Sequence, residues 1–151
     1  MANIIVSACL LGFDCRYKGD GCLCERLAAL AEKHTLIPVC PEQLGGLPTP
    51  RDPAEICGGK VIDSAGRDVT AKFSAGAPAA LKAARLNRVN TAVLKARSPS
   101  CGRGLIYDGT FTGRKIPGDG FTAKLFLENE INVFTEDELD ELENYIINQD
   151  K

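Results

Sequence analysis

Three cysteines lie at the ends of apolar runs that are typical of buried β-strands. Cys9 follows NIIVSA, Cys40 follows LIPV, and Cys101 follows AVLKARSPS. In an open α/β sheet the ends of successive parallel strands line one crevice, so ligands far apart in the sequence can meet there. Three thiolates at such a crevice could bind an inorganic centre and leave one coordination position free. A free position is typical of catalytic sites, because it can bind a substrate atom.

The available ligands favour a soft metal. The chain has seven cysteines but a single histidine, His34, which lies in a turn between a predicted helix and a predicted strand. All-thiolate coordination suits an iron–sulfur cluster or zinc. Widely separated cysteines fit a cuboidal cluster better than the paired ligands of zinc ribbons, although spacing alone leaves both metals open. So many cysteines in a chain of this length favour metal or redox chemistry over disulfides.

The other four cysteines are expected to be small hydrophobic residues. They are Cys15, Cys22, Cys24 and Cys57. Cys24 begins a predicted helix, and Cys22 is too close to it for the usual CxxC ligand pair. One of the four could still supply a fourth ligand, and a cluster-bearing sensor or electron carrier would use Cys15 in this way.

Groups that can transfer protons lie near two of the three cysteines. Glu42 follows Cys40 by two residues in a proline-rich segment and is a candidate general base, the alternative being a solvated, inert loop residue. Ser98 and Ser100 flank Pro99 immediately before Cys101. Their hydroxyl groups either cap the turn or donate a hydrogen bond to a reacting substrate.

Hydrophobic periodicity predicts strands that alternate with helices in a single domain, residues 1–151. The predicted strands cover residues 3–8, 36–39, 91–95 and 131–134. The predicted helices cover residues 24–33, 70–88 and 121–129, and a closing helix begins at the capping box of Thr135 and Glu138. This order predicts a Rossmann-like α/β fold, with a doubly wound, mainly parallel sheet of about four strands.

Glycine and proline mark the connecting segments. Residues 41–53 contain four prolines and two glycines, which predict a stiff, ordered loop and an active-site wall. Residues 60–68 read as a small exposed hairpin insertion, and residues 108–120, with four glycines, read as a loop. Pro78 is expected to kink the helix around it or to start a new one.

Composition limits the classes of partner. The 151 residues are 44% hydrophobic and carry a net charge of −2 without a basic block, which argues against a nucleic-acid surface. No run approaches the ~20 apolar residues of a membrane helix, and the first residues do not resemble a secretion signal. We therefore expect a cytoplasmic protein with a small-molecule substrate and no nucleic-acid or membrane partner. Its oligomeric state, monomer or homodimer, stays open.

Six segments, in order along nearly the whole chain, resemble the DUF523 family, which includes the thiouracil desulfidases. The segments are SACLLG (7–12), RYKG (16–19), PVCPEQLGGLPTPR (38–51), GRDVT (66–70), KARSPSCG (95–102) and IYDGTF (106–111). The long block around Cys40 is the most specific of them. Lys18 departs from the family pattern, in which an acidic residue is expected, and this difference bears on substrate choice.

The resemblance implies a 4Fe-4S cluster with Cys9, Cys40 and Cys101 as ligands and a fourth iron open to the substrate's sulfur. It also implies hydrolytic, non-redox removal of that sulfur, as sulfide, from 2-thiouracil or a related thioamide or thiolated nucleobase. The family's catalytic glutamate and serine correspond to Glu42 and Ser98, with Ser100 as the other candidate serine. Two alternatives remain: an iron–sulfur redox sensor or electron carrier without hydrolytic activity, and a zinc-binding structural module.

Overall fold

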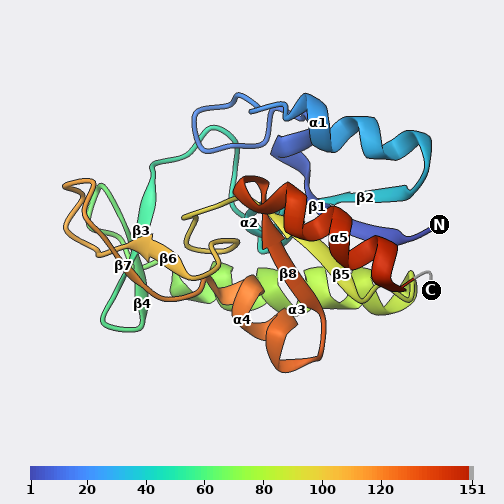
Figure 1. Ribbon diagram of the computed structural model, residues 1–151. Coiled ribbons are helices and arrows are strands. Elements are labelled where there is room, and N and C mark those ends of the chain that lie inside the picture. Colours follow the sequence, from blue (N-terminus) through green and yellow to red (C-terminus); the bar gives the residue numbers. More distant parts are fainter. Residues whose placement is uncertain (150–151) are drawn as a thin grey trace.

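A parallel sheet forms the centre of the molecule. The computed structural model describes residues 1–149, and within them one four-stranded sheet has the order β2-β1-β5-β8. Its strands are β1 (Asn3–Ser7), β2 (Thr35–Val39), β5 (Thr91–Leu94) and β8 (Asn132–Thr135). Every pairing in this sheet is parallel, and Figure 1 shows the strands between two layers of helices. The predicted Rossmann-like α/β fold is therefore confirmed.

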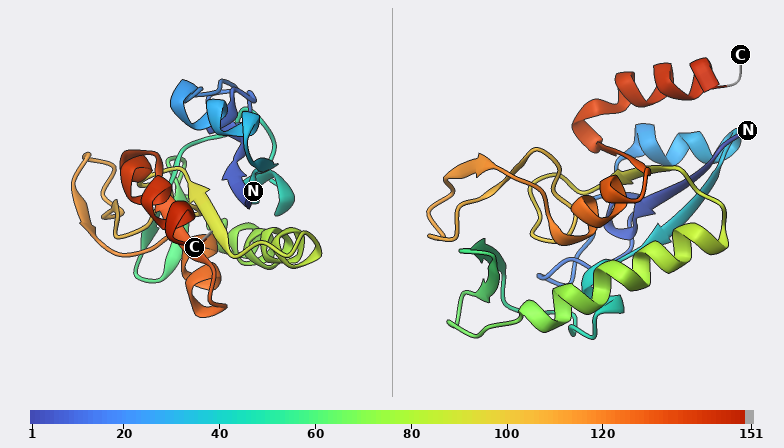
Figure 2. Two further views of the ribbon diagram at one scale, coloured as in Figure 1. Left: turned by 45° about the vertical axis from the view of Figure 1, so that its right-hand side comes forward. Right: turned by 90° about the horizontal axis from the view of Figure 1, so that it is seen from below.

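Helices cover both faces of the sheet. They are α1 (Glu25–Ala28), α3 (Thr70–Leu86), α4 (Phe121–Glu128) and α5 (Leu139–Gln149). The 3-10 helix η2 (Ala29–Glu32) continues α1, and η3 (Glu136–Glu138) precedes α5. Helices α1 and α5 lie on one face, and α3 and α4 lie on the other (Figure 1). The right-hand view of Figure 2 shows α3 running along the sheet.

The residues of β1 explain this layered arrangement. Ile4, Ile5 and Val6 are fully buried, as expected for a parallel strand that is covered on both faces. Ile4 and Val6 contact the apolar cluster under α1 and α5, whereas Ile5 belongs to the cluster under α3 and α4. The continuous apolar run therefore supplies both halves of the core.

Two hairpins lie beyond the carboxyl ends of the sheet strands (Figure 1). One pairs β3 (Ala54–Cys57) with β4 (Lys60–Asp63), and the other pairs β6 (Leu105–Tyr107) with β7 (Lys115–Pro117). The predicted hairpin at residues 60–68 is found, because Ile62 pairs antiparallel with Asp68 and the N–H of Asp63 donates to the carbonyl oxygen of Arg67. The longer pairing of β4 is with β3, and the turn between them is at Gly58 and Gly59, which both have positive φ angles. The predicted loop at residues 108–120 contains β7, which is too short to show a strand period.

The structure refines two further predictions about proline. The segment predicted as a loop begins with the short helix α2 (Pro41–Leu44), which has Pro41 in its first turn, where proline fits because its missing N–H has no helical partner. Helix α3 passes through Pro78 without starting a new helix. Ser74 and Pro78 are both exposed, so the carbonyl that loses its helical donor faces solvent.

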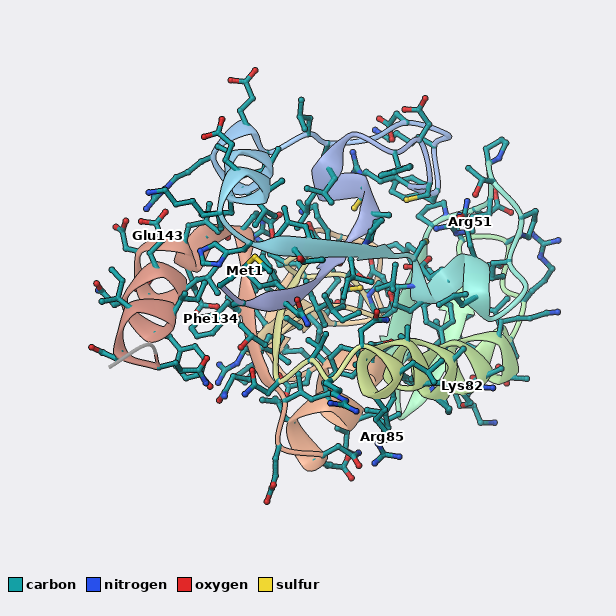
Figure 3. The ribbon with its side chains drawn as sticks, turned by 90° about the vertical axis from the view of Figure 1, so that its right-hand side faces the viewer. Met1, Arg51, Lys82, Arg85, Phe134 and Glu143 are labelled. Carbon is teal, nitrogen blue, oxygen red and sulfur yellow. The ribbon has the colours of Figure 1, made fainter. Side chains whose placement is uncertain are left out.

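The helices are polar at their ends and on the sides that face away from the core. The predicted capping box is confirmed, because Glu138 accepts a hydrogen bond from the N–H of Thr135, whose hydroxyl caps η3. Lys82 projects from the outer face of α3, and Arg85 extends from α3 to Asn129 at the end of α4 (Figure 3). None of the helices in residues 1–149 has the length and apolar character that a membrane crossing requires.

Candidate active site

A cavity of about 590 Å³ opens at the carboxyl ends of the sheet strands. From β1 the chain continues to β2 on one side, and from β2 it crosses to β5 on the other side. The carboxyl ends of β1 and β5 therefore flank the point where the direction of winding reverses, which is where open α/β sheets bind ligands. The cavity is lined by residues of the sheet ends, of α2 and of both hairpins.

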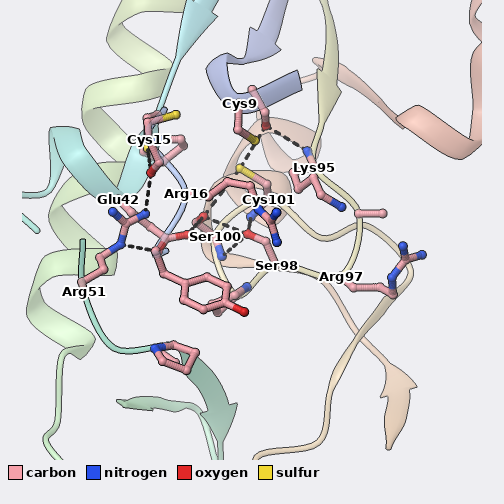
Figure 4. Close-up of a pocket in the computed structure, with 18 of the residues that line it drawn as sticks. Cys9, Cys15, Arg16, Glu42, Arg51, Lys95, Arg97, Ser98, Ser100 and Cys101 are labelled. Carbon is pink, nitrogen blue, oxygen red and sulfur yellow. Dashed lines mark hydrogen bonds and ion pairs between the residues drawn. The ribbon is translucent and has the colours of Figure 1, made fainter. Parts of the chain in front are cut away.

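Cys9, Cys40 and Cys101 all line this cavity. Cys9 lies in the 3-10 helix η1 (Ala8–Leu11) directly after β1, and Cys40 is the N-cap residue of α2 directly after β2. Cys101 follows β5 after a longer turn. The structure therefore brings together the three cysteines that the sequence singled out, as Figure 4 shows for Cys9 and Cys101.

Burial keeps the thiols of Cys9 and Cys101 protonated in the absence of a metal. Burial raises the pKa of Cys9, and the neighbouring thiols of Cys22 and Cys101 raise it further. Burial also raises the pKa of Cys101 to about 11, although hydrogen bonds from Ser7 and Ser100 oppose this effect. A positively charged centre would reverse this preference, because it stabilises thiolates.

Ser7 connects the ends of two strands behind Cys101. Its Oγ donates to Cys101 Sγ over 3.3 Å and accepts from the backbone N–H of Lys95 over 2.8 Å. Ser7 is 3% exposed, so this hydrogen-bonded arrangement is shielded from water. Ser7 ends β1, the strand that leads to Cys9, and its hydroxyl group orients the thiol of Cys101.

Cys15, the residue expected to supply a fourth ligand in a sensor or electron carrier, also lines the cavity. Burial, together with the neighbouring thiol of Cys40, raises the pKa of Cys15 to about 12. Cys22 and Cys24 are half-buried beside the core, whereas Cys57 is exposed, contrary to the expected burial. All seven cysteines are free thiols in the described structure.

Glu42 is held by an arginine that the sequence analysis missed. Arg51 Nε lies 3.2 Å from Glu42 Oε1, with only 7% of the arginine side chain and 18% of the glutamate side chain exposed. Arg51 also donates from Nη2 to the carbonyl oxygen of Cys15 over 3.0 Å (Figure 4). The one available signal was its place at the end of the PVCPEQLGGLPTPR segment. Glu42 is therefore a mostly buried, ion-paired residue rather than a solvated one.

The two serines join Glu42 in one hydrogen-bonded chain. Ser100 Oγ donates to Glu42 Oε2 over 2.9 Å, and Ser98 Oγ lies 3.0 Å from Ser100 Oγ. Ser98 Oγ also accepts the backbone N–H groups of Ser100 and Cys101, over 3.1 and 2.9 Å. If Ser100 uses its only hydroxyl proton toward the carboxylate, Ser98 must donate to Ser100. The chain therefore runs from Ser98 through Ser100 to Glu42.

Glycines let the backbone segments that carry these groups come close together. A Cβ on Gly76 of α3 would lie 2.0 Å from the carbonyl oxygen of Pro41, and one on Gly45 would lie 2.0 Å from that of Lys72. A Cβ on Gly120 would lie 2.5 Å from the carbonyl carbon of Ser100. Residues 40–42 and 98–101 are therefore fixed by backbone contacts with α3 and with the start of α4.

Comparisons with known proteins agree with this fold. The model of the 2-thiouracil desulfurase family matches residues 4–138. The uncharacterised protein YbbK of Bacillus subtilis (strain 168) is 41% identical over 149 residues, which cover 92% of this chain and 99% of the relative. A solved structure named as the 4Fe-4S-dependent thiouracil desulfidase TudS is 44% identical, with a TM-score of 0.91 over 97% of this chain and 98% of the other.

These matches confirm the resemblance that the six segments indicated. The family model spans the three cavity cysteines, Glu42 and both serines. The relative and the solved structure each align with almost their whole length, so the likeness extends over the complete fold rather than over one motif. The chain belongs to the 2-thiouracil desulfurase family.

Proposed function

We propose that this chain is an iron–sulfur-dependent desulfidase that removes sulfur from 2-thiouracil or a related thioamide. The observation that carries the proposal is the convergence of Cys9, Cys40 and Cys101 with Glu42 on one cavity. Family membership and the printed name of the similar solved structure support it. That name does not favour the alternative of a redox sensor or an electron carrier, and nor does it favour a structural zinc module.

The three cysteines suit a 4Fe-4S cluster as ligands. Their donor atoms are all sulfur, which soft iron centres prefer. Each cysteine of such a cluster binds a different iron, so the sulfur atoms need not surround one point. This is compatible with the arrangement in residues 1–149, where no three His, Cys, Asp or Glu side chains are grouped around a single ion position. Three ligands leave the fourth iron open.

Glu42 is the proposed general base. When bound, the cluster would supply a soft Lewis acid that polarises the C=S bond of the substrate. Glu42 takes a proton from the attacking water, and Arg51 holds its carboxylate in place from the opposite side. Water supplies the oxygen of the product and sulfur leaves as hydrogen sulfide, so the reaction requires no net electron transfer.

Ser98 is the proposed hydrogen-bond donor to the substrate. Its hydroxyl lines the cavity at the far end of the chain from Glu42. While Glu42 is ionised, the Ser98 hydroxyl donates to Ser100. Once Glu42 has taken a proton from water, the chain can reverse, so that Ser100 donates to Ser98 and Ser98 donates to the departing sulfur, because neighbouring oxygen atoms in this chain are 3.0 and 2.9 Å apart. In this arrangement Ser100 connects the two catalytic groups rather than replacing Ser98.

The cavity fits a small molecule rather than a polymer. Its volume of about 590 Å³ lies in the range of sites for small ligands. The proposed substrate is a thiolated nucleobase or another thioamide, and we propose no nucleic-acid or membrane partner. The cytoplasmic location and the choice between monomer and homodimer remain predictions from the sequence.

The proposal is tested on protein reconstituted with iron and sulfide under anaerobic conditions. We expect bound iron with acid-labile sulfide, and conversion of 2-thiouracil to uracil and sulfide without added reductant. In water enriched in oxygen-18, the uracil should carry one heavy oxygen, which tests the hydrolytic step separately. A protein that binds the cluster but releases sulfide from no thioamide would contradict the desulfidase proposal and favour the sensor.

A further inference from the structure

Phe111 is an aromatic residue of the cavity with no role in the chemistry described above. It lies in the loop between β6 and β7 and lines the cavity together with Tyr107 of β6. Its side chain is 40% exposed, so the ring contributes little to the core. The cavity places this ring and the three cysteines around the same space.

The backbone of Phe111 is held in an unfavourable conformation. Its φ angle is +58°, in the left-handed region that residues with a large side chain rarely adopt. Such conformations persist where surrounding contacts fix them, and they gather at ligand-binding sites. Because Phe111 lines the cavity and is partly exposed, its ring is available to contact a ligand there.

Glu55 supplies the contacts that fix this loop. Its Oε1 accepts the backbone N–H groups of Gly109 and Phe111, over 3.0 and 3.2 Å. Glu55 lies on β3, so one carboxylate connects the two hairpins across the cavity. Gly109 allows the close approach, because a Cβ there would lie 2.8 Å from Cys57 Cβ. The position of Phe111 is thus set in part by the other hairpin.

We infer that Phe111 is a specificity-determining residue whose ring stacks on the planar ring of a thiolated heterocycle, and that Glu55 is the positioning residue that presents it. The inference rests on the proposed function for the identity of the substrate. Stacking suits this site because every nucleobase has an apolar π-face, whatever its substituents. It would favour cyclic thioamides over acyclic ones, which have no ring to stack.

The first test compares a cyclic and an acyclic substrate. Phe111→Ala should raise KM for 2-thiouracil about tenfold, as loss of a base–aromatic stack does, while kcat stays unchanged because stacking stabilises ground state and transition state alike. Phe111→Tyr should keep the wild-type KM. For thioacetamide, Phe111→Ala should change nothing. Ile116→Ala, an exposed apolar residue of β7 outside the cavity lining, is the matched control.

The second test addresses Glu55. Glu55→Ala should raise KM for 2-thiouracil as Phe111→Ala does, whereas Glu55→Gln should change it little, because its amide oxygen can still accept both N–H groups. The double variant Phe111→Ala/Glu55→Ala should be no worse than Phe111→Ala alone, since Glu55 acts through the ring. Additive effects would show that Glu55 acts independently and would overturn its positioning role.

The third test needs no catalysis. The sequence contains no tryptophan, so Phe111→Trp introduces a single fluorophore at the cavity. Uracil should quench its emission in a saturable manner, and acetamide should not. An unchanged KM in Phe111→Ala, or no response of Phe111→Trp to uracil, would overturn the inference. If the wild type released no sulfide but Phe111→Trp still responded to uracil, the proposed function would fail while the stacking role stood.

Discussion

Glu42, Ser98 and Ser100 form one hydrogen-bonded chain. Substitutions at each position test which role each side chain has. Glu42→Gln keeps the size of the side chain but removes its basicity. The cluster spectrum should persist, while turnover falls by the ~100-fold or more that is typical for loss of a general base. Anaerobic spectra and steady-state rates on the same sample measure both quantities. Unchanged turnover in Glu42→Gln would remove this residue from the mechanism.

The serines allow a sharper comparison. Ser98→Ala should lower kcat, though less than Glu42→Gln, because the substrate loses a hydrogen-bond donor. If protons pass through Ser100, Ser100→Ala should lower kcat to a similar extent, and the double variant should be no slower than either single variant. A double variant whose losses multiply would mean that the two hydroxyl groups act independently. The three proposed cysteine ligands are unchanged in these variants, so an unchanged cluster spectrum is the control for cluster binding.

A further prediction concerns the three cysteines that are proposed to bind the cluster. Cys9→Ser, Cys40→Ser and Cys101→Ser should each abolish the brown colour and the activity, because a cluster held by three thiolates has no spare ligand. Iron analysis and visible spectra of each variant measure the outcome, with circular dichroism as the check on folding.

The other cysteines serve as controls, and one of them discriminates between mechanisms. Variants of Cys22, Cys24 and Cys57 should keep cluster and activity. Cys15→Ser should also keep both if the fourth iron is open, even though Cys15 neighbours Cys40 in the cavity. A folded Cys15→Ser protein that lost its cluster would show four-cysteine ligation and would support the sensor.

Some of these residues could be predicted from sequence and others could not. Cys9 and Cys40 follow the ends of clear apolar runs, and Glu42 and Ser98 were implied by the resemblance. Arg51 was not predictable, because its contact with Glu42 depends on how residues 45–50 return the chain to α2. The position of Ser100 between Ser98 and Glu42 depends on the same long-range packing.

At the scale of elements, the contact between α2 and α3 decides where Cys40 and Glu42 lie. Gly76→Ala would normally stabilise a helix by about 1 kcal/mol. Here the added methyl group meets the carbonyl oxygen of Pro41 at 2.0 Å, so the variant should be destabilised and should displace α2. We expect lower cluster occupancy and lower kcat, together with a lower urea midpoint.

Ser74→Ala is the matched control, because Ser74 lies on the exposed face of the same helix. It should leave the midpoint and the cluster content close to wild type. A Gly76→Ala protein more stable than wild type, with full cluster content, would show that α2 is not fixed by this contact.

The elements that the sequence missed share a physical cause. Helix α2 spans only Pro41–Leu44, and β6 and β7 span three residues each. Segments this short cannot display a helical or strand period, so their conformation comes from the groups they contact. The longer segments, such as α3 and β1, carry their own apolar pattern and were predictable for that reason.

At the scale of the whole molecule, the cavity lies between a predictable sheet and two less predictable hairpins. Because the sheet is parallel, the three proposed cysteine ligands, Glu42 and the two serines all lie at the carboxyl ends of its strands. The hairpins add Glu55, Tyr107 and Phe111, which face the same space from outside the sheet. We propose that the residues at the carboxyl ends of the strands determine the reaction, and that the hairpin residues determine which substrate binds.

Buried thiols at this edge should make the stability of the metal-free protein depend on alkaline pH. Burial raises the pKa of Cys101 from 9.0 to about 11, so the folded protein keeps a thiol protonated that the unfolded chain ionises. The contribution of this protonated thiol to the free energy of unfolding is complete below pH 9.0. It is lost as the pH rises through the folded-state pKa of Cys101. For this thiol alone the difference corresponds to about 3 kcal/mol of unfolding free energy.

Urea unfolding of the reduced, metal-free protein at about pH 8 and about pH 10 measures about half of this loss, because pH 10 lies midway between the two pKa values. Cys101→Ala should lose less stability between the two pH values than wild type does, and the remaining loss comes from the other buried thiols, Cys9 and Cys15, whose pKa values are also raised. Cys57→Ala, which removes an exposed thiol, should behave as wild type. The cluster-loaded protein should resist the same pH change, because iron already binds its ligands as thiolates. An equal loss in wild type and Cys101→Ala would mean that folding does not raise the pKa of this thiol.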